Sequence, residues 1–110
     1  MRIFASLMIG LLFAGFAGPA PAQDLPGDAA AGRSLAVTVC AVCHAVGTVA
    51  PDAAADRPPS FQSLADDPAM TALALRVFLR TPHRNMPNLI LTEAESDDVI
   101  AYILALRRGQ

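Results

Sequence analysis

The hydrophobic positions of this chain follow two patterns along its length. Near the start, residues 3–17 are almost continuously apolar. Farther along, apolar residues recur in three segments with the spacing of one helix face. Between these segments, residues 45–65 are rich in Gly, Pro, Asp and Ala without a sustained period, and residues 83–88 also read as a loop. The pattern predicts an all-α protein.

The N-terminal apolar run has the organisation of a secretory signal peptide. Arg2 precedes it, and Ala20-Pro21-Ala22 follows it as a small-residue cleavage site. An uncleaved membrane anchor is the alternative, but a bilayer span needs about 20 apolar residues and this run is shorter. We therefore expect residues 1–22 to be a signal peptide that directs export to the periplasm. Residues 23–110 then form a single small domain without a membrane span.

Local capping signals place the three helices. Asp28 is a plausible N-cap of the first helix. Asp67-Pro68 predicts the start of the second, which stops before Pro82. The third opens on a capping box made by Thr92 and Glu95. The predicted apolar faces are Gly32, Leu35, Ala36 and Val39; then Met70, Leu73, Ala74, Val77 and Phe78; then Val99, Tyr102, Ile103 and Leu106.

The composition of the chain argues against nucleic-acid binding and indicates a small core. The formal net charge is −2 and no Lys is present, whereas nucleic-acid binding calls for a basic face. After removal of the leader, few large side chains remain to fill a core. A domain this small usually needs a covalent or metal staple.

The two cysteines supply a candidate staple. They lie in Cys40-Ala41-Val42-Cys43-His44, the Cys-x-x-Cys-His signature of haem c attachment. Two thiols at this spacing can each add to one haem vinyl group, and His44 can then reach the iron. A disulfide is an alternative, although so small a loop constrains the unfolded chain little. Thiol–disulfide exchange is another, but the residues before Cys40 do not resemble a strand.

The motif, its position near the start of the mature chain and the three helices together resemble a small class I cytochrome c. The resemblance extends over the whole mature chain. It implies an all-α cytochrome c fold in which an N-terminal helix, a haem loop, a middle helix and a C-terminal helix surround one covalent haem c.

The resemblance also assigns roles to individual residues. Gly32 would permit close crossing of the first and last helices, and the carbonyl of Pro59 would accept a hydrogen bond from His44. Met86, followed by Pro87, matches the family's sixth iron ligand. His83 is the alternative ligand, an open sixth site is another, and Met70 reads as core filler.

Ligation by His44 and Met86 raises the reduction potential and saturates the iron. We therefore expect a monomeric periplasmic one-electron carrier, not an enzyme, that exchanges electrons with a donor dehydrogenase and an acceptor oxidase or reductase. The alternatives are a cytochrome subunit of a periplasmic dehydrogenase, and a haem peroxidase or gas-binding protein with a labile sixth ligand. Arg76, Arg80 and Arg84 are candidates for a basic docking patch.

Overall fold

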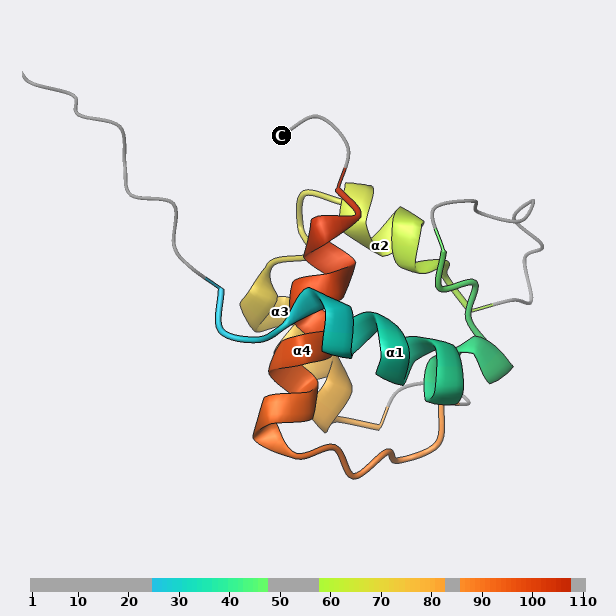
Figure 1. Ribbon diagram of the computed structural model, residues 1–110. Helices are drawn as coiled ribbons and strands as arrows, with labels where there is room; N and C mark the ends of the chain where they lie inside the picture. The colour runs from blue at the N-terminus through green and yellow to red at the C-terminus, as the bar shows by residue number, and fades with distance from the viewer. Residues whose placement is uncertain (1–24, 48–57, 83–85, 108–110) are drawn as a thin grey trace, which may run out of the picture.

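The computed structural model describes residues 25–47, 58–82 and 86–107 (Figure 1). Within these ranges the chain is helical and contains no strand. Helix α4 (Glu93–Ala105) lies at the centre and contacts each of the other α-helices. Helix α1 (Ala29–Val39) crosses in front of it in Figure 1, and α3 (Ala72–Arg80) lies behind. The predicted all-α class and cytochrome c fold are confirmed.

The capping predictions for the first and last helices are correct. The Asp28 carboxylate accepts hydrogen bonds from the N–H groups of Ala30 and Ala31, at 2.7 and 3.3 Å. At the start of α4, the Thr92 hydroxyl accepts from the Glu95 N–H, and the Glu95 carboxylate accepts from the Thr92 N–H at 2.8 Å. Each cap satisfies N–H groups that the first turn of a helix leaves unpaired.

Helices α1 and α4 touch backbone to backbone at Gly32. A Cβ atom at this position would overlap the main-chain carbonyl of Asp98. Ala36, one turn later, is fully buried, and the Asp28 N–H donates to the Asp98 carboxylate at 2.6 Å. The close crossing expected for Gly32 is therefore present, and a small residue follows it at the same face of α1.

The region predicted to be loop before residue 65 contains a helix. Helix α2 spans Phe61–Asp66, and the Ser60 hydroxyl caps it by accepting from the Ser63 N–H at 3.1 Å. Phe61 and Ala65 are buried in the core on its inner side. The prediction was wrong here because a helix of fewer than two turns is too short to establish a 3.6-residue period.

The predicted start of the middle helix at Asp67-Pro68 is also wrong. The Asp67 carboxylate accepts from the Ala69 N–H at 2.8 Å and closes a turn. Helix α3 begins only at Ala72, with Thr71 as its N-cap. Met70 therefore lies before the helix, where it packs partly buried against the core. The end of α3 at Arg80, before Thr81-Pro82, is as predicted.

The core is built mainly from α4. Val99, Tyr102 and Ile103 are buried as predicted, together with Ile100, while Leu106 is half-buried. The buried set is Ala36, Phe61, Ala65, Leu75, Val99, Ile100, Tyr102 and Ile103. Only two of these side chains are aromatic, which agrees with the expectation of a small core.

Candidate haem-attachment site

The Cys-x-x-Cys-His motif lies where α1 ends. A 3-10 turn, η1 (Cys40–Val42), continues the helix. The N–H groups of Cys43 and His44 both donate to the Cys40 carbonyl, at 3.1 and 2.9 Å. The tight turn therefore holds two thiols and an imidazole together on a segment anchored to α1.

Both thiols are free, so the structure contains no disulfide between Cys40 and Cys43. Cys40 is partly buried, and burial raises the pKa of its thiol above the ordinary value of 9.0. A cysteine used for thiol exchange has a lowered pKa, because the thiolate is the attacking species. The environment of Cys40 works against that reaction.

The His44 ring is oriented by a hydrogen bond. Its Nδ1 lies 2.7 Å from the carbonyl oxygen of Pro59. Since a carbonyl can only accept, Nδ1 carries a proton, and in the neutral imidazole Nε2 is then the nitrogen with a lone pair for a metal. A backbone carbonyl bound to the second ring nitrogen is the usual way in which proteins orient a metal-binding histidine. The structure thus brings Pro59 to His44 as the resemblance implied.

Two aromatic residues, Phe61 and Tyr102, lie beside the His44 ring in succession, and the sequence did not indicate a functional role for either. The Phe61 ring packs 5.6 Å from the His44 ring, centroid to centroid, and the Tyr102 ring packs 6.3 Å from Phe61. The sequence predicts Tyr102 only as part of the apolar face of the last helix. Neither contact had a signal in the sequence, because both join segments far apart in the chain.

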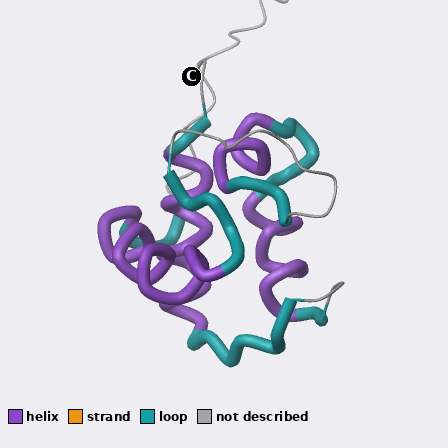
Figure 2. The backbone as a smooth tube through the Cα atoms, turned by 90° about the vertical axis from the view of Figure 1, so that its right-hand side faces the viewer, coloured by secondary structure: helices purple, strands orange, loops and turns teal. Residues whose placement is uncertain are grey.

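Met86 is described and half-buried. It begins the segment 86–92, which runs along one end of the helical assembly before α4 (Figure 2). The other thioether, Met70, packs against the core, and its main-chain carbonyl accepts from Arg107 at 3.0 Å. His83 and Arg84 lie outside the described residues. Of the two methionines in the described residues, Met70 thus has the structural role that the sequence predicted.

These residues fit a covalently bound haem. Two free thiols can attach haem c, an imidazole can ligate its iron, and a thioether is one of the usual second ligands in cytochromes c. Large apolar side chains are also exposed in the same segments: Val42 in the motif is 83% exposed, and Ile90 after Met86 is 94% exposed. Exposed apolar groups of this kind are suited to contact an apolar macrocycle or a partner surface.

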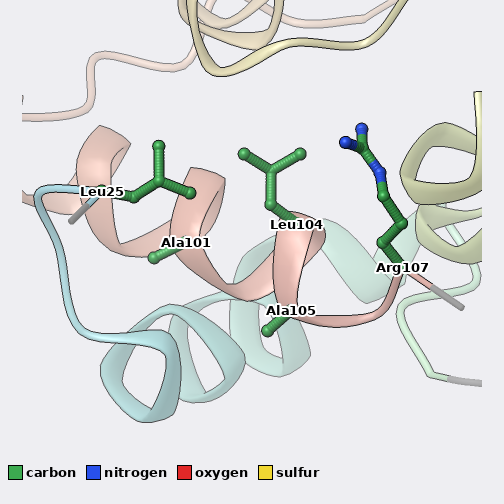
Figure 3. Close-up of a pocket in the computed structure, with 5 residues that line it drawn as sticks. All are labelled: Leu25, Ala101, Leu104, Ala105 and Arg107. Atoms are coloured by element: carbon green, nitrogen blue, oxygen red, sulfur yellow. The ribbon is translucent and has the colours of Figure 1, made fainter. Parts of the chain in front are cut away.

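A separate pocket lies over the outer side of α4. Leu25, Ala101, Leu104, Ala105 and Arg107 line it, and the side chains of Leu25, Leu104 and Arg107 project in the same direction in Figure 3. None of these residues belongs to the Cys-x-x-Cys-His motif or carries a soft metal donor. The pocket is therefore distinct from the candidate haem site.

The comparisons with known proteins agree with the donor set. A family model described as “Cytochrome C oxidase, cbb3-type, subunit III” matches residues 27–103. A protein named Cytochrome c-552, from Bradyrhizobium diazoefficiens, is 42% identical over 83 residues, which cover 76% of this chain and 79% of the relative. The chain belongs to the class I c-type cytochromes. No solved structure gives a significant match.

Membership of this family establishes the broad chemistry. This cytochrome contains haem c, covalently bound with its iron, and it transfers electrons instead of catalysing a reaction on a substrate. Its electron transfer implies redox partners. Among the described residues, no helix is long and apolar enough to cross a membrane.

The candidate basic patch is largely neutralised. On α3, Arg76 forms an ion pair with Asp97 of α4. Arg76 and Arg80 also lie 3.8 and 3.9 Å from the Glu93 carboxylate. These two guanidinium groups therefore connect α3 to α4, and their charges are offset by neighbouring carboxylates.

Proposed function

We propose that this cytochrome is a periplasmic one-electron carrier whose haem c is attached through Cys40 and Cys43 and ligated by His44 and Met86. The observation that carries the proposal is the 2.7 Å contact between His44 Nδ1 and the Pro59 carbonyl. It leaves Nε2 as the free ring nitrogen beside two unlinked thiols. That arrangement suits an iron ligand better than a solvated or core histidine.

The bound haem would supply a one-electron Fe(III)/Fe(II) couple. The chain's own residues determine how it works. The Pro59 carbonyl orients His44 and raises the basicity of its ring, while the thioether of Met86 favours the reduced state. With His44 and Met86 both bound, the iron would have no free position for peroxide or a gas, so electron exchange is the activity that this ligand set supports.

Export and processing are part of the proposal. Residues 1–22 have the charged start, apolar run and small-residue cleavage site of a signal peptide, which directs a chain to the periplasm. The mature domain would then begin at Gln23. Mass spectrometry of the exported protein tests this directly, since a chain that retains Met1 would contradict it.

A matched pair of methionine variants tests the sixth ligand. In Met86→Ala holoprotein, the long-wavelength sulfur-to-iron absorption band of the oxidised state should disappear, and cyanide should bind faster than in the wild type. The reduction potential should fall, because a thioether favours ferrous iron. Met70→Ala is the control and should keep the band. Absence of the band from the wild-type holoprotein, as His83 ligation would give, or its loss in Met70→Ala with the band intact in Met86→Ala, would refute the assignment.

A second candidate is a cytochrome fixed within a larger redox complex. The matching family model carries the description of an oxidase subunit, and Val42 and Ile90 expose apolar surface of the kind that protein partners cover. Gel filtration separates the two cases. A free carrier elutes as a monomer and remains folded alone, whereas a subunit requires its partner for stability.

A further inference from the structure

The C-terminal helix α4 contacts two residues beside His44: Val46, which follows it in the sequence, and Phe61, which packs against its ring. The Tyr102 hydroxyl of α4 donates to the Val46 carbonyl at 2.6 Å, across 56 positions of sequence. Val46 is two residues after His44. The hydrogen bond therefore fixes the backbone that follows the histidine to the central helix α4.

The same helix also touches the segment that supplies the orienting carbonyl. The Tyr102 ring packs against Phe61, and Phe61 packs against the His44 ring with an interplanar angle of 55°. The Phe61 N–H donates to the Ala45 carbonyl at 2.9 Å. Since Phe61 follows Pro59 by two residues, this bond sets the distance between His44 and the Pro59 carbonyl.

The contacts of Tyr102 with Val46 and Phe61, and of Phe61 with His44, form one connected network. Tyr102 and Phe61 are buried, with 7% and 3% exposure, so their rings have little freedom to move. A buried tyrosine normally gives its hydroxyl to a partner, and a carbonyl left without one destabilises its segment. A disturbance at Tyr102 should thus reach His44 by two routes, through the Val46 carbonyl and through the Phe61 ring.

We propose that Tyr102 is a positioning residue for the axial histidine, acting through the Val46 carbonyl and the Phe61 ring to hold His44 on the Pro59 carbonyl. The inference rests on the proposed role of His44 as iron ligand. It adds that the orientation of this ligand is determined by α4 and not by the haem motif alone. Tyr102 does not touch the donors itself, so it acts only by position.

Two variants of the holoprotein separate the two routes. Tyr102→Phe removes the hydroxyl and keeps the ring, and Phe61→Leu removes the ring contact and keeps an apolar side chain. The matched control is Thr92→Ala, which weakens the same helix at its N-cap without touching the network. All three variants are compared with the wild type for global stability by denaturant unfolding.

Two readouts report on His44 specifically. The first is the exchange rate of its Nδ1 proton in the reduced holoprotein, measured by NMR and divided by that of the slowest α4 amides, which report global opening. We expect Tyr102→Phe to accelerate this ratio by roughly fivefold, the equivalent of one lost hydrogen bond. The second is the set of g values of the oxidised iron, which follow the plane of the axial imidazole and should shift in Phe61→Leu.

The Thr92→Ala control should leave both readouts at the wild-type values while it lowers stability. If Tyr102→Phe and Phe61→Leu behave like this control, Tyr102 is only a core residue and the proposal is wrong. If instead the wild-type holoprotein shows no iron-bound His44 resonances, the ligand assignment itself is wrong. The two failures are therefore distinguishable.

Discussion

The crossing of α1 and α4 gives the sharpest stability prediction, because two effects of one substitution have opposite signs. In Gly32→Ala, the gain in helix propensity alone would stabilise the protein by about 1 kcal/mol. The new methyl group, however, would overlap the Asp98 main-chain carbonyl. A backbone atom cannot rotate away as a flexible side chain can, so the two helices must separate.

The size of the net effect follows from these terms. Overpacking a well-packed contact costs typically about 1–3 kcal/mol, and the overlap at Gly32 places it at the upper end. After the propensity gain is subtracted, we expect a net loss of about 2 kcal/mol. In a domain of this size that corresponds to a decrease in Tm of about 8–16 °C. The Asp28–Asp98 hydrogen bond, at 2.6 Å, would also be strained by the separation.

The assay is denaturant and thermal unfolding of the holoprotein, followed by far-UV circular dichroism. Gly47→Ala is the matched control, since a Cβ atom at Gly47 would meet no described residue other than its chain neighbours within 4 Å. Its stability should stay within about 0.5 kcal/mol of the wild type. A Gly32→Ala protein as stable as the wild type, or more stable, would show that the helices do not cross as closely as described.

Three further predictions follow from the ion pairs, the capping box and the haem motif. Arg76→Ala should destabilise the protein by about 1–2 kcal/mol, which lies between the usual values for exposed and buried ion pairs. The loss arises because the Asp97 side chain, only 15% exposed, no longer has its partner. An additional Asp97→Asn substitution should recover part of the lost stability, as measured by urea unfolding. Hydrogen bonds from Thr92 lower the pKa of Glu95 below its ordinary value of 4.5. The stabilisation from this carboxylate is therefore complete above pH 4.5 and is lost as the pH falls through the folded-state pKa. Glu95→Gln should flatten this part of a plot of Tm against pH, and a curve identical to the wild type would contradict the contribution of the capping box. Replacing both cysteines with Ala should give an unfolded or rapidly degraded chain, whereas a compact haem-free protein by circular dichroism would contradict the dependence of the core on haem.

The parts of the fold that local chemistry determines could be predicted from the sequence. Asp28, Thr92 and Glu95 act within three residues of their own positions, so their caps follow from residue type and spacing. The start of α3 could not be chosen in the same way. Asp67 and Thr71 both have side chains that can cap a helix, and only the packing of the following segment decides that Asp67 closes a turn instead.

In the candidate haem site, too, local features could be predicted from the sequence and contacts between distant residues could not. The haem motif identified Cys40, Cys43 and His44 as a unit because the chemistry is contained in five consecutive residues. The contact between His44 and Pro59 spans 15 positions and was expected only through the family resemblance. The hydrogen bond between Tyr102 and Val46 spans 56 positions, and no local sequence pattern indicates that these two residues interact. Tertiary packing alone creates that contact.

The proposed electron transfer depends most directly on the covalent attachment of haem to Cys40 and Cys43. Mass spectrometry of the tryptic peptide between Arg33 and Arg76 measures it, because this peptide contains both Cys40 and Cys43. We predict the mass of the peptide plus that of one haem. A peptide that carries only free thiols, or a disulfide, would contradict the central claim.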